Sequence, residues 1–349
     1  MSRSKSEDRY RLYGAIGSPY AAKMWAILRY RRLPFDWVAA GQAWAPSYIR
    51  AHPDIAAVRP AIIPILYFPH DGSYRPDSTV QAYVLEECHP GERSLVPDDP
   101  GHAFLSHLLE DMGDEWGVKI AFQYRWGNEL DNEFTSRVVC GEILGLGTDE
   151  ATVIAAAKEF RDRQIGRMPL VGCTPQNQPP IEESYHRVLD AISLLPGESP
   201  FLFGGRPALA DFGWFGALFT CSRDPTPGRI MVERSHATYR WVQVLDDASG
   251  IGGEWCDAHA PLPKATTALL ALAGAVYLPF LEANAAALEE GEEMFEFQPL
   301  GQTYRQGTFR YQAKCLNWLR QEFAALEGDA RRRTEDILAE TGCLAYLKT

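Results

Sequence analysis

The chain has 349 residues, of which 46% are hydrophobic and 23% charged, a balance typical of a globular protein large enough for two domains. The net charge of −12 disfavours a polyanionic partner such as nucleic acid. The polar start of the chain lacks a signal peptide's apolar region, and the most apolar run, residues 265–281, is interrupted by Gly274 and Pro279 and too short for a membrane span.

Seven cysteines are scattered through the chain without a CxxC pair, which suits reduced thiols better than a disulfide framework. The segment from Cys256 to His259 offers only three candidate ligands, so no metal site is expected. We therefore expect a soluble, cytoplasmic protein that binds neither a membrane nor nucleic acid.

The first elements predicted along the chain are a strand, a helix and a second strand. Residues 10–15 alternate polar and apolar side chains like a strand, and residues 17–19, Gly-Ser-Pro, turn the chain into a helix. Apolar residues then recur at helical spacing up to Leu33, and residues 34–38 read as a second strand. Residues 44–58 are irregular, with a short helix and a loop expected.

Residues 59–87 are predicted to form a strand, a turn, a second strand and a helix. Residues 62–68 are β-branched and aromatic, Asp71 and Gly72 form a hairpin turn, and Tyr74 begins the next strand. Asp77 and Ser78 open a helix. Pro64 cannot donate to a sheet ladder, so it must lie at an edge, a bulge or a cis bend. A cis bend would expose the backbone of Ile63 to a partner.

Residues 90–100 are rich in proline, glycine and aspartate and are predicted to be a linker, and the rest of the chain reads as helical. Helices are expected at residues 102–126, 134–146, 149–160, 182–195 and 236–245. The last hundred residues contain an apolar helix at 265–288, an aromatic-rich segment at 295–311 and helices at 312–326 and 329–349.

The order of elements in the first 90 residues, with Pro64 and then Asp77-Ser78, resembles the thioredoxin-like domain of cytosolic glutathione transferases. Residues 201–212, FLFGGRPALADF, resemble the folding signature of that family's helical domain. Ala208 stands where the family has a hydroxyl residue, so one half of a capping box with Asp211 is missing, which costs about 1 kcal/mol. The resemblance covers roughly residues 10–248.

The resemblance implies an α+β fold with three parts. Residues 9–90 would form a thioredoxin-like glutathione-binding domain with a mixed four-stranded sheet. Residues 98–260 would form an all-helical domain, and residues 261–349 a helical extension that the family lacks. Homodimers are usual in the family, and the extension would cover or enlarge that interface.

The resemblance is to serine-type, bacterial-like members and implies that Ser18 activates the glutathione thiol. A free thiol with a pKa near ~8.5 is only slightly ionised at neutral pH, so an enzyme must favour the thiolate. Ser18 precedes Pro19 at a helix start, where a hydroxyl and the positive helix end could both act. A serine there is also an ordinary helix cap. Tyr13 is the alternative donor, although a strand aromatic usually packs on the sheet.

The resemblance also implies which residues bind the tripeptide. The backbone of Ile63, before a cis Pro64, would pair with the cysteinyl part, and Asp77 and Ser78 would hold the γ-glutamyl group. A family lysine that meets the glycyl carboxylate is replaced by Ile62, and Arg59, Gln42 or His52 could substitute.

A hydrophobic acceptor is expected between the two domains, against the first long helix. The residues expected to line its pocket are Tyr20, Trp116, Lys119, Ile120, Tyr124 and Arg125. Aromatic residues of the extension, Tyr304 among them, could roof this pocket, but they are more simply read as core.

The expected function is a glutathione transferase with glutathione as cosubstrate, acting in detoxification by conjugation or glutathione-dependent elimination on a hydrophobic electrophile. The alternative is a non-catalytic binding or protein-interaction module with the same fold, which Ile62, Ala208 and the long extension favour.

Overall fold

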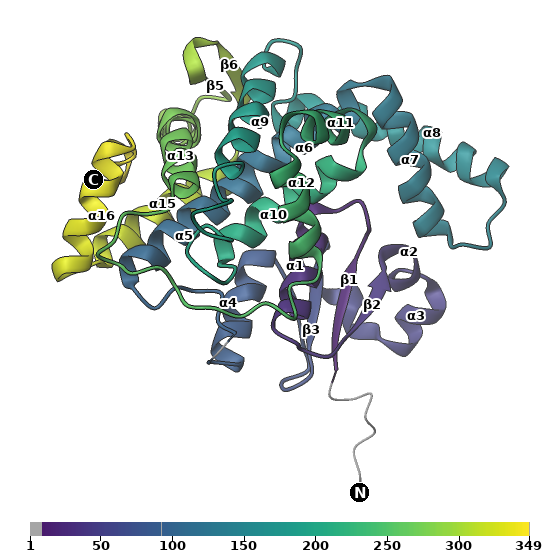
Figure 1. The fold of residues 1–349 in the computed structure, drawn as a ribbon. Helices are drawn as coiled ribbons and strands as arrows, with labels where there is room; N and C mark the ends of the chain where they lie inside the picture. Colours follow the sequence, from purple (N-terminus) through teal and green to yellow (C-terminus); the bar gives the residue numbers. More distant parts are fainter. Residues whose placement is uncertain (1–8, 92, 349) are drawn as a thin grey trace, which may run out of the picture.

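The computed structural model describes residues 9–91 and 93–348 (Figure 1). The polar start of the chain, which bears on the expected absence of a signal peptide, and Thr349 at the end of the expected extension lie outside these residues.

The first domain is built on a mixed four-stranded sheet with strand order β2-β1-β3-β4. Its strands are β1 (Tyr10–Gly14), β2 (Phe35–Ala39), β3 (Ile65–Phe68) and β4 (Ser73–Pro76). Strand β1 runs parallel to β2 and antiparallel to β3, so Leu12 lies opposite Trp37 on one side and Leu66 on the other. The predicted mixed sheet is confirmed. Strand β3 starts three residues later than expected, because Pro64 has no N–H to donate to a ladder.

Helices α1 (Pro19–Tyr30) and α4 (Ser78–Cys88) complete this domain. Met24, Ile27 and Leu28 of α1 are fully buried and belong to the same apolar core as Leu12 and Leu66 of the sheet. The irregular region between β2 and β3 forms short helices rather than one helix and a loop: α2 (Ala40–Ala43), α3 (Pro46–Ala51) and the 3₁₀ helix η1 (Pro53–Ala57).

The second part of the chain is helical, as predicted. Its elements are α5 (Pro100–Met112), the π-helical turn η2 (Gly113–Gly117), α6 (Val118–Gly127), α7 (Glu129–Leu144), α8 (Glu150–Arg167), the 3₁₀ turn η3 (Met168–Val171), α9 (Gln178–Ile192), α10 (Leu209–Arg223), α11 (Pro225–Arg234) and α12 (His236–Asp246). Helix α10 is buried from Leu209 to Cys221 and lies at the centre of the molecule (Figure 1). A Cβ at Gly213 would lie 2.8 Å from Cα of Glu110, so only glycine allows α10 to approach α5 this closely.

The start of α10 has the half capping box that the sequence predicts. The buried carboxylate of Asp211 accepts hydrogen bonds from the backbone N–H of Ala208 at 2.8 Å and of Leu202 at 3.0 Å. The backbone carbonyl of Ala208 accepts from the N–H of Asp211 at 3.0 Å, but Ala208 has no side-chain oxygen to complete the capping box. Burial raises the pKa of Asp211 to about 7, although the backbone N–H groups favour its charged form.

The extension packs on the helical domain, on the side of the molecule opposite α7 and α8 (Figure 1). It comprises α13 (Lys264–Leu272), the π-helical turn η4 (Ala273–Tyr277), α14 (Leu278–Glu290), β5 (Met294–Phe297), the 3₁₀ turn η5 (Pro299–Gly301), β6 (Tyr304–Gly307), α15 (Arg310–Ala325), α16 (Gly328–Glu340) and α17 (Leu344–Leu347).

The apolar run was expected to be too short to span a membrane, and this prediction of its length is wrong. Helices α13, η4 and α14 form one continuous helix of 27 residues, because the π-helical turn carries the chain past Gly274 and Pro279 falls in the first turn of α14. By length and composition this helix could cross a bilayer. That is weak evidence, since 61% of its most apolar stretch is buried inside the protein, as in the core helix of a soluble protein.

The extension is also not entirely helical. The aromatic-rich segment folds into a two-stranded antiparallel hairpin, in which Phe297 of β5 pairs with Tyr304 of β6. Phe295, Glu296 and Phe297 alternate aromatic and polar side chains, a strand pattern that the helical expectation overlooked.

Candidate functional site

A cleft of about 1030 Å³ lies between the first domain and helices α6, α7 and α8. The first domain contributes the turn between β1 and α1, helix α2 and the segment 61–63 that precedes Pro64. The lining residues are Ala15, Gly17, Ser18, Ala40, Gly41, Trp44, Ala45, Ala61, Ile62, Ile63, Arg125, Trp126, Val139, Ile143, Phe160, Arg163, Gln164 and Arg167. No residue of the described extension is among them.

Ser18 lies on this cleft and also caps α1. Its Oγ accepts a hydrogen bond from the backbone N–H of Ala21 at 3.3 Å, which is the ordinary role of a serine at a helix start. Because the cap uses Ser18 as an acceptor, its hydroxyl proton is still available to a group in the cleft. Both interpretations of Ser18 are therefore compatible with the geometry.

The Ile63–Pro64 peptide bond is cis, as expected from the position of Pro64 before β3. Within the described part of the chain, neither the N–H nor the C=O of Ile63 forms a hydrogen bond. The side-chain amide of Gln81 donates to the carbonyls of Pro64 at 2.9 Å and Arg75 at 2.7 Å, and so ties the bend to β4. Sequence reasoning gave Gln81 no role, although a glutamine in an otherwise apolar helix face was a signal.

Arg125 holds the turn that carries Ser18 in place by hydrogen bonds. Its guanidinium donates to the carbonyl of Gly17 at 2.6 Å and to the carboxylate of Asp224 at 2.7 and 3.1 Å. The side chain of Glu142 accepts from the N–H of Ile16 in the same turn at 2.6 Å. Asp224 and Glu142 have no sequence signal, because each is a single acidic residue far along the chain from Ser18.

Asp77 and Ser78 lie at the start of α4, but their side chains are already engaged. One oxygen of Asp77 caps α4 by accepting from Thr79 and Val80, and the other accepts from the hydroxyl of Tyr311 in the extension at 3.1 Å. The buried hydroxyl of Ser78 donates to Asp114 at 3.3 Å.

Beneath Ser78, the buried Lys23 bonds to Glu110 and, at 2.7 Å, to Asp114. Two carboxylates thus share one buried cation. Burial raises the pKa of Asp114, with the charge of Glu110 adding to the effect.

Two predicted tyrosines do not face the cleft. Tyr13 is fully buried in the sheet, and its hydroxyl meets that of Tyr48 at 3.0 Å. Burial raises the pKa of Tyr13 far above its ordinary value, and Tyr13 is not among the residues that line the cleft. Tyr20 donates to the carbonyl of Asp114 at 3.1 Å instead of lining the acceptor pocket.

Four of the other expected acceptor residues are buried core, which corrects that prediction. The extension fills the space beside α6: Trp116 packs with Phe280 and Tyr304 at centroid distances of 5.4 Å, and Lys119 donates to the carbonyl of Val171 and the side chain of Gln306. Burial lowers the pKa of Lys119 to about 8. Ile120 and Tyr124 are buried in the same core. Of the residues expected to line the acceptor pocket, only Arg125 lines the cleft. Tyr304 is a core residue, which confirms the simpler of its two interpretations.

The three suggested partners of the glycyl carboxylate are not on the cleft surface either. Arg59 donates to the carbonyls of Ala56 and Val58, Gln42 is exposed, and His52 packs on Tyr48 at 4.5 Å. Arg163 and Arg167 of α8 line the cleft instead. Arg125 is already paired with the carboxylate of Asp224, so Arg163 and Arg167 supply the positive charge of a lining that contains no carboxylate. The cleft therefore favours an anionic ligand.

Comparison with protein families matches residues 12–93 to the model described as "Glutathione S-transferase, N-terminal domain". Comparison with curated proteins found no match.

Similar solved structures include a glutathione S-transferase from Methylobacterium radiotolerans in complex with glutathione sulfonate, with 21% identity, a TM-score of 0.41, and coverage of 72% of this chain and 98% of that chain. The beta-etherase LigF from Sphingobium sp. strain SYK-6 has 18% identity, a TM-score of 0.42, and coverage of 68% and 94%. Ure2p in complex with glutathione has 14% identity, a TM-score of 0.38, and coverage of 69% and 95%.

The family match spans the strands, helices and cis-proline bend that border the cleft. Residues 12–93 therefore match the N-terminal domain of the glutathione S-transferases.

Proposed function

We propose that this protein is a serine-type glutathione transferase that transfers the glutathione sulfur to a hydrophobic electrophile. The observation that carries the proposal is the convergence, on one open cleft, of the Ser18 hydroxyl and the unpaired backbone of Ile63 before a cis proline. A detoxifying role in the cytoplasm, as a homodimer, is part of the same proposal.

In this proposal the cysteinyl backbone of glutathione pairs with the free N–H and C=O of Ile63. The thiol loses its proton to solvent, and the Ser18 hydroxyl donates to the resulting thiolate. Lowering the thiol pKa by two units takes about 2.7 kcal/mol of differential interaction, which a hydrogen bond to an anion at a helix N-terminus can supply. The thiolate then attacks the electrophilic carbon, a carbon–sulfur bond forms, and the leaving group departs with its electron pair.

The cleft offers the reaction two further features. Arg125 holds the Gly17 carbonyl and so positions the turn that carries Ser18. Trp126 of α6 and Phe160 of α8 supply an apolar wall for the acceptor, and Trp44 adds an aromatic side chain from the first domain. None of the three belongs to the extension. These residues replace the buried set as the proposed acceptor pocket.

A second candidate, a non-catalytic binding module, is favoured by one observation. Asp77, the residue proposed to meet the γ-glutamyl ammonium, already accepts three hydrogen bonds, one of them from Tyr311 of the extension. Glutathione would have to displace Tyr311 or share Asp77 with it.

Retention on immobilised glutathione and turnover of glutathione with 1-chloro-2,4-dinitrobenzene distinguish the two candidates. We expect the wild type to be retained and active, and Ser18→Ala to be retained but at least about 100-fold slower in kcat/KM. Retention without turnover would support the binding module, and the absence of both would overturn glutathione binding.

Ser235→Ala is a matched control, because Ser235 caps α12 through the N–H of Thr238 at 3.1 Å and does not line the cleft. Each variant should lose about 1 kcal/mol of stability through its cap. Only Ser18→Ala should lose activity. Equal activity in the two variants would remove Ser18 from the mechanism.

A further inference from the structure

The cleft at Ser18 carries positive charge that the proposed reaction does not use. Arg163 and Arg167 of α8 line the cleft, and no aspartate or glutamate is among its described lining residues. The third arginine of the lining, Arg125, is neutralised by Asp224, whose carboxylate accepts from two of its nitrogen atoms at 2.7 and 3.1 Å. The positive charge that a bound molecule meets in this cleft therefore comes from α8.

One face of α8 presents these arginines to the cleft. Phe160, Arg163, Gln164 and Arg167 all line it, and they follow one another at the three- and four-residue steps that place side chains on one side of a helix. The side-chain amide of Gln164 adds a neutral hydrogen-bond donor. This face thus combines an aromatic ring with two guanidinium groups and an amide.

Neither arginine is engaged by the rest of the fold. Within residues 9–91 and 93–348, the ion pairs of α8 all involve Arg161, which meets Glu133 at 3.2 Å and Asp162 at 3.9 Å. Arg163 and Arg167 are exposed and form no side-chain hydrogen bond with a described residue. Both guanidinium groups can therefore bind an anion that enters the cleft.

The charge of α8 lies beside the apolar wall proposed for the acceptor. The guanidinium carbon of Arg163 is 5.2 Å from the ring centroid of Phe160, which forms that wall with Trp126. Ile63, which would hold the cysteinyl backbone of glutathione, belongs to the first domain instead. The position of these arginines therefore assigns them to the acceptor rather than to the cysteinyl part of glutathione.

We propose, on the basis of the proposed function, that the acceptor is an aromatic electrophile that carries an anionic substituent such as a carboxylate. The ring packs on Phe160 and Trp126, and the anion accepts hydrogen bonds from Arg163 and Arg167. A carboxylate has enough lone pairs for both guanidinium groups. In a chain with net charge −12, this cleft attracts an anion that most of the protein repels.

The anionic substituent anchors the acceptor and does not react. In 4-chloro-3,5-dinitrobenzoate, the thiolate attacks the ring carbon that bears chlorine, a carbon–sulfur bond forms, and chloride leaves with the bonding electron pair. The carboxylate lies across the ring from that carbon. An anchor so far from the reacting bond stabilises the ground state and the transition state alike, so it lowers KM more than it raises kcat.

Turnover of 4-chloro-3,5-dinitrobenzoate and of 4-chloro-3,5-dinitrobenzamide by the full-length protein tests the proposal. The two acceptors share the reacting carbon, the leaving group and the nitro groups, and they differ in charge. Each kcat/KM is divided by the rate constant of the uncatalysed reaction with glutathione, because the two substituents activate the ring to different extents. We expect the corrected kcat/KM to be at least about tenfold higher for the benzoate.

Replacement of both Arg163 and Arg167 by glutamine should remove this preference, mainly through a higher KM for the benzoate. Arg163→Gln and Arg167→Gln should each lower the preference about threefold, because each leaves one guanidinium in place. A double variant that keeps the preference but has a higher KM for glutathione would place both arginines at the glycyl carboxylate and overturn the proposal.

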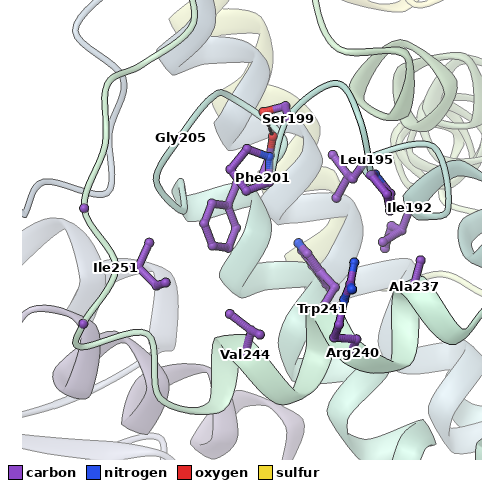
Figure 2. Close-up of a pocket in the computed structure, with 14 residues that line it drawn as sticks. Ile192, Leu195, Ser199, Phe201, Gly205, Ala237, Arg240, Trp241, Val244 and Ile251 are labelled. Atoms are coloured by element: carbon purple, nitrogen blue, oxygen red, sulfur yellow. Dashed lines mark hydrogen bonds between the residues drawn. The ribbon is translucent and has the colours of Figure 1, made fainter.

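Two arginines outside the cleft provide matched controls. Arg161→Gln removes a charge from the same helix, but Arg161 pairs with Glu133 and does not line the cleft. Arg240→Gln removes an exposed charge from a separate hollow of about 410 Å³ beside α12, which shares no lining residue with the cleft (Figure 2). Both controls should keep the wild-type preference. Loss of the preference in either control would attribute it to the net charge of the protein and overturn the proposal.

Failure of the anion site and failure of glutathione transfer give different results. Turnover of both acceptors without a preference would overturn the anionic acceptor and leave glutathione transfer at Ser18 standing. If neither acceptor reacts, glutathione transfer fails, and calorimetric titration with 3,5-dinitrobenzoate and 3,5-dinitrobenzamide, which lack the leaving group, still tests the anion site. Equal affinity for these two ligands, or wild-type affinity for 3,5-dinitrobenzoate in the double variant, would overturn that site as well.

Discussion

Asp77 is the residue whose engagement bears most directly on glutathione affinity. It has a positive φ of 75° and uses one carboxylate oxygen to cap α4. Its other oxygen faces Tyr311, a residue more than two hundred positions along the chain. A side chain that the family resemblance assigns to a ligand is thus shared between a helix cap and the extension.

Tyr311→Phe should raise the affinity for glutathione about three- to tenfold. The substitution removes the hydroxyl that occupies Asp77, so the γ-glutamyl ammonium no longer has to break a hydrogen bond to a charged group. Titration calorimetry with glutathione measures the change, and Tyr239→Phe is the control, because Tyr239 is exposed on α12. Weaker binding by Tyr311→Phe than by wild type would mean that Tyr311 contributes to the site rather than blocking it.

At the scale of single elements, the stability of the protein depends on the caps at helix starts and on the contacts between pairs of helices. Helix α10 is buried along most of its length, so the missing half of its cap lies in the middle of the protein rather than at its surface. Ala208 has the extended φ and ψ, −95° and 173°, that a capping residue needs.

Ala208→Ser should therefore stabilise the protein by about 0.5–1 kcal/mol, because its hydroxyl can accept a hydrogen bond at the start of α10 and complete the capping box with Asp211. Urea unfolding followed by circular dichroism measures the effect. Ala208→Gly, which adds no oxygen, should give no gain, and a Ser variant less stable than wild type would show that the buried hydroxyl finds no partner.

The stability that the contact between α5 and α15 gives to the fold should depend on pH. His107 of α5 is buried and its Nδ1 lies 2.6 Å from the carboxylate of Glu322 on α15. Burial lowers the pKa of His107, but the Glu322 hydrogen bond and the charge of Glu110 outweigh burial and raise it to about 9. A raised histidine pKa stabilises the fold fully below about pH 6.5, and this contribution is lost as pH rises through about 9.

Between pH 6 and pH 10 the wild type should lose roughly 3 kcal/mol more unfolding free energy than His107→Gln. Denaturant unfolding at several pH values gives this difference, and the variant itself controls for other groups that titrate. If the unfolding free energies of the two proteins changed with pH in parallel, His107 would be neutral in the fold.

At the scale of the whole molecule, the extension is part of the core rather than an appendage. Phe280 and Tyr304 pack on Trp116, and Tyr277 donates to the buried Asp111 of α5 at 2.6 Å. Burial raises the pKa of Asp111 to about 6. The proposed boundary near residue 260 therefore divides the chain by sequence resemblance but cuts through a continuous apolar core.

Deletion of residues 261–349 should expose Trp116 and its neighbours, and the shortened protein should bind 1-anilinonaphthalene-8-sulfonate and lose cooperative thermal unfolding. Near-ultraviolet circular dichroism and a thermal melt check this. A sharp melt with a native near-ultraviolet spectrum would show that the first two parts fold without the extension.

The sequence alone determined the order of strands and main helices in the first domain, the bend at Pro64, the helix start at Ser18 and the incomplete cap at Ala208. These features depend on residues close together in the chain: a proline that cannot donate, a serine before a proline, and an alanine three residues before an aspartate.

Only the tertiary structure decided which side of α6 is open. Trp116, Lys119 and Tyr124 have the helical spacing of a pocket wall, but the same spacing serves a core helix, and periodicity cannot say which partner covers a face. The extension covers this face, ties Tyr311 to Asp77, and leaves the cleft to α7 and α8. These contacts join residues up to 234 positions apart, so no local pattern in the chain encodes them.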